Sequence, residues 1–186
     1  MKRLYAFDFD GTLTTADTLL VFIRYACGTW RFIVGFLLHS PLLVLMKLKL
    51  YPNYRAKQRI FAWYFRGMEL KTFDALCRQF AERNACLIRP KAKALLERLF
   101  SEGESVCVVS ASIDNWVRPF FTNMATNSRS NFCVLGTQVE TDNNGLLTGR
   151  FLTNNCYGAE KVERLCKQYT GSAFHFPSQT QAAYLP

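Results

Sequence analysis

Short apolar runs alternate with helical patterns along most of the chain. Residues 3–8 (RLYAFD) form a run that ends in carboxylates and a glycine, which predicts a buried strand opening into a loop. Val106–Val109 and Phe132–Leu135 are further runs of this kind, and the second leads into a hairpin-like stretch with its turn at 142–145. Helical patterns cover Pro90–Phe100, the region near Asn115–Met124, and Gly158–Tyr169. Strands alternating with helices predict an α/β fold with a parallel sheet.

One long helical stretch interrupts this alternation. From Thr18 to about Ala85 the pattern is helical and rich in aromatic residues. Its few turn signals are Gly28, Pro41 and Pro52. We therefore expect a core domain made of residues 1–16 and 86–186, and a helical insertion of residues 17–85.

Composition is that of an ordinary globular protein. The chain has 186 residues, of which 49% are hydrophobic and 20% charged. It is long enough to bury a real core, as one domain with an insertion. Collagen-like, low-complexity and wholly disordered classes are excluded.

Most of the positive charge lies in the insertion. The chain carries 23 Lys and Arg against 14 Asp and Glu, a net charge of +9. Residues 18–70 contain one acid, Glu69, and eight basic residues: Arg24, Arg31, Lys47, Lys49, Arg55, Lys57, Arg59 and Arg66. Such a segment attracts phosphate esters, lipid headgroups or nucleic acid. Its basic residues are scattered among bulky apolar ones without a recognised nucleic-acid motif, so we expect no nucleic-acid partner.

Phe32–Leu50 is the membrane candidate of the sequence. Residues 39–41 (HSP) interrupt it, and Lys47 and Lys49 lie inside its far end. A membrane span needs roughly 20 mostly apolar residues, so this segment is not a clean crossing. Two interpretations stay open: a buried helix of the insertion, or a helix that also touches a membrane surface.

Cysteine usage and the N-terminal segment indicate the compartment. The seven cysteines are odd in number and widely spaced, and none form a CxxC pair. This argues against a zinc site or a disulfide framework and favours reduced thiols. Only four uncharged residues separate the basic pair Lys2-Arg3 from Asp8, too few for the apolar region of a signal peptide. We expect a cytoplasmic protein whose insertion could contact the inner membrane.

The segment Asp8-Phe-Asp-Gly-Thr12 carries the strongest chemical signal. In extended chain, Asp8 and Asp10 point to the same side. Neighbouring carboxylates repel unless a cation shares them, and Mg²⁺ is the natural partner of such oxygen ligands. Gly11 permits a tight turn, and Thr12 offers a hydroxyl and an amide to a ligand. The alternative is a turn with two solvated acids.

Ser110 and Lys161 are two further candidate site residues, later in the chain. Ser110 follows the strand Val106–Val109, and the carboxyl end of a parallel strand is where α/β proteins bind ligands. Its hydroxyl and the following amides could hold phosphate oxygens, although a serine there is also a common helix cap. Lys161 lies on the last predicted helix, where a lysine is usually solvated.

In this order, the motifs DFDGT, VVSAS and GAEK resemble three of the four motifs of the haloacid dehalogenase superfamily of phosphohydrolases. The resemblance covers residues 1 to about 170 and implies a Rossmann-like parallel sheet. The spacing between the first two motifs is similar to that of subfamily IB, which has an inserted helical C1 cap. That subgroup contains phosphoserine phosphatases and a bacterial phosphatidylglycerophosphatase.

The resemblance implies a role for each motif residue. Asp8 would be the nucleophile and form an aspartyl-phosphate, and Asp10 would serve as general acid and then general base. Mg²⁺ would be held by the Asp8 carboxylate and the Asp10 main-chain carbonyl. Ser110 and the Ala111 amide would bind the phosphoryl group, and Lys161 would offset its developing charge.

Substrate recognition beyond the phosphate stays open. In phosphoserine phosphatases the place of Asp17 holds a glutamate that helps to bind the substrate amine. Asp17 is one methylene shorter, and the alternative is a helix N-cap. Arg55, Arg59 or Arg66 could reach a second anionic group of the substrate.

The fourth motif of the family, a Gly-Asp-rich segment with a further metal carboxylate, is missing. No Asp or Glu occurs after Glu163, and the strand candidate Ala173–Phe176 runs into an unpatterned tail. We expect a C-terminally truncated or frame-shifted enzyme, a chain that borrows a carboxylate from a partner, or a non-catalytic relative. Metal affinity and activity should then be lower than in a full-length homologue.

These residues favour a Mg²⁺-dependent phosphomonoester hydrolase. Its substrate would be a phosphorylated small molecule or a phospholipid headgroup phosphate, and the apolar, basic insertion favours the second. The alternative is a non-enzymatic relative that binds an anion without turnover.

Overall fold

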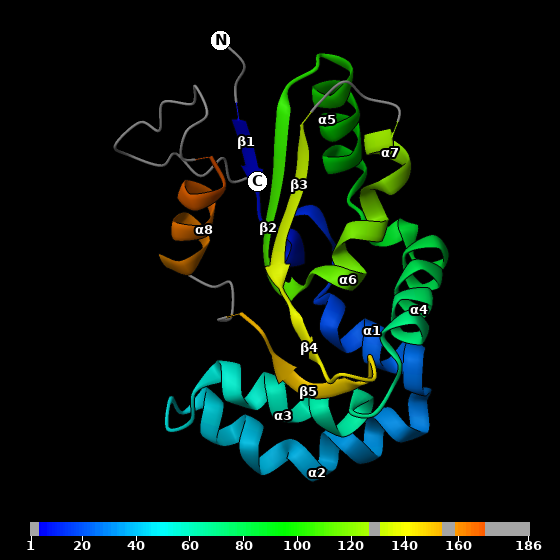
Figure 1. The fold of residues 1–186 in the computed structure, drawn as a ribbon, viewed down its shortest axis with the longest axis vertical. Helices are drawn as coiled ribbons and strands as arrows, with labels where there is room; N and C mark the ends of the chain where they lie inside the picture. The colour runs from blue at the N-terminus through cyan, green and yellow to red at the C-terminus, as the bar shows by residue number, and fades with distance from the viewer. Residues whose placement is uncertain (1–3, 127–130, 154–158, 170–186) are drawn as a thin grey trace.

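The sheet is parallel, as the alternation of strands and helices predicts. The computed structural model describes residues 4–126, 131–153 and 159–169. Strand β2 (Ser105–Ile113) lies between β1 (Leu4–Phe7) and β3 (Phe132–Thr137), and both neighbours run parallel to it (Figure 1). The expected α/β fold with a Rossmann-like parallel sheet is confirmed. The strand candidate at 173–176 lies outside the described residues.

Helices cover both faces of the sheet, which explains the continuous apolar run of β2. Val106 and Val108 pack in the main core cluster, whereas Cys107 and Val109 pack with Leu165 and Tyr169 in a second, smaller cluster. Successive strand residues point to opposite faces, so β2 is apolar at every position from 106 to 109. The first cluster includes α5 (Pro90–Ser101), and the second is covered by α8 (Ala159–Tyr169).

The insertion is helical, as expected. Its helices are α1 (Thr18–Cys27), α2 (Thr29–Lys47), α3 (Asn53–Phe65) and α4 (Leu70–Arg83), followed by the short turn η2 (Ala85–Leu87). Gly28 and Pro52 lie at helix boundaries, but Pro41 lies inside α2, so its interpretation as a turn signal was wrong. Proline leaves the Leu37 carbonyl without its helical N–H partner, and the Ser40 hydroxyl donates to that carbonyl at 2.8 Å instead.

The segment after β2 departs from the prediction of one helix. It forms three short pieces: α6 (Asp114–Val117), η3 (Arg118–Phe121) and α7 (Thr122–Thr126). Pro119 at the start of η3 cannot donate to the preceding turn, which breaks the helix there. Strand β2 also runs on through the Ser-Ala-Ser sequence to Ile113, with a shift in its register against β3 between Val109 and Ile113.

The hairpin expected near 142–145 is present and packs on the insertion. Strands β4 (Val139–Thr141) and β5 (Leu147–Phe151) are antiparallel, and the Asp142 carboxylate accepts from two amides of the turn. The amide of Phe151 donates to Gln58 Oε1 of α3 at 3.1 Å. The hairpin thus lies beside α3, away from the parallel sheet (Figure 1).

One aromatic cluster joins the insertion to the sheet. Phe22 of α1 is fully buried and contacts Phe73 and Phe80 of α4 and Trp116 of α6. Its ring stacks on Trp116 with centroids 4.8 Å apart. Because such rings bury a large apolar area, this cluster fixes the insertion helices against the carboxyl end of β2.

Gly35 sets the close approach of α2 to α3, and its replacement tests that packing. A Cβ at this position would overlap the Tyr64 hydroxyl and lie 2.5 Å from Trp63 Cζ3. The Tyr64 hydroxyl donates to the Phe32 carbonyl at 2.9 Å, so that bond would be displaced. We expect Gly35→Ala to lower the free energy of unfolding by about 1–2 kcal/mol, despite the better helix propensity of alanine.

Urea unfolding followed by circular dichroism measures this change. Val34→Ala is the matched control, because Val34 is the neighbouring residue and its side chain is exposed. A Gly35→Ala protein that is more stable than the wild type would contradict the packing.

Candidate active site

The first motif folds into a tight turn at the carboxyl end of β1. Asp8 follows the strand, and its side chain accepts from the Phe9 amide at 2.9 Å. Asp10 (φ −69°, ψ 125°) and Gly11 (φ 74°, ψ −13°) have the dihedrals of a type II turn, whose third position requires a positive φ. Glycine supplies that conformation without steric cost. The turn holds both aspartates at the mouth of the sheet.

Lys161 reaches Asp8 from the other end of the chain. Its Nζ lies 2.7 Å from Asp8 Oδ1, and the side chains of the lysine and the aspartate are 23% and 44% exposed. Helix α8 is anchored on β3: Arg164 Nη1 donates to the Gly136 carbonyl at 2.7 Å, and the Tyr169 hydroxyl lies 3.2 Å from Cys133 Sγ. These contacts fix the helix that carries the lysine.

Asp10 is held by a set of hydroxyl and amide donors. Its Oδ1 accepts from the Thr18 amide at 2.8 Å and from the Thr18 hydroxyl at 2.6 Å. Its Oδ2 accepts from the Ser112 hydroxyl at 2.5 Å and from the Ser110 hydroxyl at 3.4 Å. The carboxyl group of Asp10 therefore has one fixed orientation, between α1 and the end of β2.

Three of the residues around Asp10 were not among the predicted site residues. Thr18 begins α1, Ser112 lies in the quoted VVSAS motif without an assigned role, and Trp116 Nε1 donates to Thr18 Oγ1 at 3.3 Å. For Ser112 the period of two was the available signal, because it places Ser112 on the same side of β2 as Ser110. No local pattern links Thr18 or Trp116 to Asp10.

Arg89 holds the turn through hydrogen bonds to its main-chain carbonyls. Its Nε donates to the Thr14 carbonyl at 3.1 Å and its Nη2 to the Gly11 carbonyl at 3.2 Å. The Arg89 amide also donates to the Leu13 carbonyl at 2.9 Å. Arg89 is thus a positioning residue for the turn, and it was not among the predicted site residues.

The remaining predicted residues lie around the same turn. Thr12 is half-buried within it, and Ala111 is half-buried between the two serines of β2. Asp17 is exposed, and its Oδ1 accepts from the Leu19 amide at 3.0 Å, so it forms the N-cap of α1. A role for Asp17 toward a substrate amine stays a prediction.

A narrow hollow separates the end of β2 from the insertion. Its volume is about 20 Å³, and Ala111 and Ser112 line it together with Lys57, Phe61 and Phe151. A space of that size holds about one water molecule. A larger substrate group would therefore need α3 and the hairpin to move away from β2.

Lys57 is the basic residue that the insertion directs toward this hollow. By contrast, Arg55 and Arg59, two of the arginines considered for a second anionic group, are exposed and lie over the rings of Tyr54 and Tyr51. Arg66 is also exposed. The sequence showed the charge of the segment but not which side chain faces β2.

The structure offers few further carboxylates for a metal ion. Asp114, at the start of α6, lies 4.0 Å from Arg118, and burial raises the pKa of its carboxyl group above the usual range. Asp74 accepts from Asn115 Nδ2 at 2.7 Å. Among residues 4–126, 131–153 and 159–169, no group of three or more His, Cys, Asp or Glu side chains is placed to hold a metal ion.

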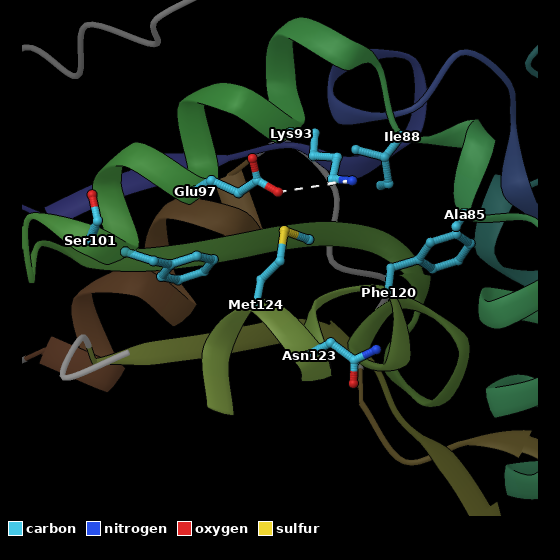
Figure 2. A pocket seen from close by; sticks show the side chains of 9 residues that line it. Ala85, Ile88, Lys93, Glu97, Ser101, Phe120, Asn123 and Met124 are labelled. Atoms are coloured by element: carbon cyan, nitrogen blue, oxygen red, sulfur yellow. Dashed lines mark ion pairs between the residues drawn. The ribbon is translucent and has the colours of Figure 1, made fainter. Parts of the chain in front are cut away.

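A larger groove lies elsewhere on the molecule. It has a volume of about 530 Å³, and Lys93 and Glu97 of α5 lie across it from Phe120 and Met124 (Figure 2). Lys93 and Glu97 form an ion pair 3.9 Å long on its rim. None of the motif residues line this groove, so the candidate site is the cluster around Asp8 and Asp10.

The cluster combines two carboxyl groups, those of Asp8 and Asp10, with the ammonium group of Lys161. Among the described residues, both hydrogen bonds to the Asp8 carboxylate end on Oδ1, so Oδ2 is the oxygen left for another partner. Asp10 lies in the turn that follows Asp8 and is linked to Ser110 by a hydrogen bond. A carboxylate, a positioned carboxyl group and an ammonium group suit displacement at a centre that bears negative charge.

Comparison with known proteins identifies related chains. The family model described as haloacid dehalogenase-like hydrolase matches residues 5–175. Protein CicA of Caulobacter vibrioides (strain NA1000 / CB15N) is 32% identical over 166 residues, which are 87% of this chain and 70% of CicA.

Solved structures share the fold at low sequence identity. A protein of unknown function from Bordetella pertussis Tohama I has a TM-score of 0.75 and 16% identity, covering 94% of this chain and 77% of its own. A phosphoserine phosphatase, solved as an analogue of its phospho-aspartyl intermediate, has a TM-score of 0.59 and 17% identity over 94% and 74% of the two chains. At such identity the likeness concerns the fold.

Proposed function

Because this chain belongs to the haloacid dehalogenase-like hydrolase family, we propose that it is a Mg²⁺-dependent phosphomonoester hydrolase that works through an aspartyl-phosphate. The observation that carries the proposal is the contact between Lys161 and Asp8 Oδ1, 2.7 Å long, at the same turn that holds the fixed carboxyl group of Asp10. We place it in the subgroup of phosphoserine phosphatases, because the spacing of its first two motifs is similar to that subgroup's and one member shares the fold.

In the first step, Asp8 Oδ2 attacks the phosphorus of a phosphate monoester. A bond forms between this oxygen and phosphorus while the bond from phosphorus to the ester oxygen breaks. The carboxyl group of Asp10 gives its proton to the departing alkoxide, which leaves as an alcohol. Lys161 and the Ser110 hydroxyl stabilise the charge on the phosphoryl oxygens.

In the second step, water hydrolyses the aspartyl-phosphate. The carboxylate of Asp10 takes a proton from the water as its oxygen bonds to phosphorus, and the bond from phosphorus to Asp8 breaks. Inorganic phosphate leaves, and both aspartates return to their starting states. The donors on Asp10 suit this double role, because Thr18 and Ser112 keep one orientation of the group in both steps.

The residues present are compatible with a magnesium ion of low affinity. Magnesium is commonly held by one or two carboxylates together with waters and substrate phosphate, which the Asp8 carboxylate and the Asp10 main-chain carbonyl would allow. When bound, the ion neutralises charge between carboxylate and phosphate. Since the described residues hold no cluster of three ligands, the affinity for free Mg²⁺ should be low.

The substrate class is a phosphorylated small molecule or a phospholipid headgroup phosphate. The side chains around the hollow beside β2 favour a substituent with apolar and anionic parts, because Phe61 and Phe151 line it together with Lys57. Such a substituent would enter only after α3 and the hairpin move away from β2. The net charge of +9 favours either anionic substrate.

Release of phosphate from p-nitrophenyl phosphate tests the activity. We expect turnover that requires added Mg²⁺, saturates only at high Mg²⁺ concentration, and stops when the ion is chelated by EDTA. Turnover unaffected by EDTA would contradict the metal requirement. Binding of orthovanadate or phosphate without any turnover would favour the alternative, a non-catalytic anion-binding relative.

A further inference from the structure

One face of α2 is apolar and uncovered. The residues exposed along it recur at helical spacing and continue just past its end: Trp30, Ile33, Val34, Leu37, Leu38, Pro41, Val44, Leu45 and, as the C-cap, Leu48. We call this set the α2 stripe. Leu37 is 65% exposed and Leu38 is 62% exposed. A soluble surface rarely leaves a stripe of this kind in water, and such patches mark interaction sites.

The opposite side of α2 packs on the body of the protein. Gly35 is buried against Trp63 and Tyr64 of α3, and His39 lies edge-on to the Trp63 ring with centroids 6.0 Å apart. These contacts hold α2 against the protein by the side opposite the stripe. The stripe is therefore not a core-facing side that has become exposed by displacement of the helix. In Figure 1, α2 is the outermost helix at the end of the molecule toward which β2 and β3 point.

The charges around the stripe are all positive. Arg31 lies in the first turn of α2, Lys47 is its last residue and Lys49 lies just beyond it; all three are exposed. Residues 18–68 contain no acidic residue, and no ion pair of their basic residues occurs in the described part of the chain. The stripe has Trp at one end and Lys at the other, and the basic groups beside it form no ion pair among the described residues. This combination is typical of a helix that lies on an anionic lipid surface.

We propose that the α2 stripe docks this protein on an anionic membrane surface, with α2 lying in the plane of the headgroups. A second copy is a poorer occupant, because pairing two stripes would bring like charges together. Helix α2 is long and apolar enough to cross a membrane by length and composition, with a mean hydropathy of 1.5. Crossing, however, would carry its packed partner α3, with Lys57 and Arg59, into the hydrocarbon.

Sedimentation of the full chain with lipid vesicles tests this proposal. We expect it to pellet with vesicles of phosphatidylcholine and phosphatidylglycerol, less with phosphatidylcholine alone, and less as salt is added. Leu37→Ser combined with Leu38→Ser should weaken the partition by at least about tenfold. Leu152→Ser is the matched control, because Leu152 is 63% exposed but lies outside the stripe.

Charge and depth give independent readouts. Lys47→Gln combined with Lys49→Gln should remove most of the preference for phosphatidylglycerol, whereas Lys71→Gln combined with Lys91→Gln, on α4 and α5, should keep it. Brominated lipids should quench the fluorescence of Trp30, which is 78% exposed, and this quenching should be lost in Trp30→Phe.

Several outcomes would overturn the proposal. The first is a wild-type chain that stays in the supernatant with anionic vesicles at low salt. The second is stripe variants that bind vesicles as well as Leu152→Ser. The third is a wild-type dimer in ultracentrifugation that is absent in the stripe variants. Bound protein that withstands alkaline carbonate would indicate a crossing helix instead. Soluble p-nitrophenyl phosphate hydrolysis does not involve the stripe, so failure here would leave the proposed activity standing.

Discussion

Asp8→Asn should lower the rate of phosphate release by at least about a thousandfold, with the fold intact. An amide oxygen is a far weaker nucleophile than a carboxylate, and no other described carboxylate contacts Lys161. Asparagine can still accept from the Phe9 amide, which caps the turn as Asp8 does. The loss should therefore be catalytic.

Steady-state hydrolysis of p-nitrophenyl phosphate and thermal unfolding together measure this effect. Glu97→Gln is the control, because Glu97 is an exposed acid on α5 that lines the groove in Figure 2, and no motif residue lines that groove. The control should retain wild-type activity. An Asp8→Asn protein with near-normal turnover would exclude Asp8 as the nucleophile.

Asp10→Asn should produce a different defect, because Asp10 acts in both steps. Turnover of an alkyl phosphate and of p-nitrophenyl phosphate should both fall by about 10²–10⁴-fold. Nitrophenolate leaves without a proton, so the first step with that substrate should survive and the aspartyl-phosphate should accumulate. The alkyl phosphate, whose leaving group needs the proton, should be blocked before the intermediate forms.

Rapid-mixing kinetics separate these cases. We expect Asp10→Asn to release a burst of nitrophenol close to one equivalent per enzyme, followed by slow turnover, and to show no burst of alcohol from the alkyl phosphate. Equal losses on both substrates with no burst on either would mean that Asp10 is not the proton carrier. The burst also distinguishes this variant from Asp8→Asn, which cannot form the intermediate.

Much of the fold was predictable because its signals are local. Strand β2 is buried on both faces, so its apolar run identifies it, and the break at Gly28 separates α1 from α2 through its positive φ of 80°. The turn at Gly11 follows from the same conformational freedom. The prediction of a turn at Pro41 was wrong because the helix continues through it. There the Ser40 hydroxyl replaces the missing backbone donor to the Leu37 carbonyl.

The sequence by itself determined the strand, the acidic turn after it and the basic, apolar character of the insertion, because each depends on residues close together in the chain. Only the tertiary structure decided which side chains meet. Lys161 reaches Asp8 across 153 positions, and Ser112 reaches Asp10 across 102, through helix and strand packing that no local pattern encodes. It likewise decided that α2 turns its small residue Gly35 to α3 and leaves Leu37 and Leu38 exposed, since hydropathy measures how apolar a helix is and not which side finds a partner.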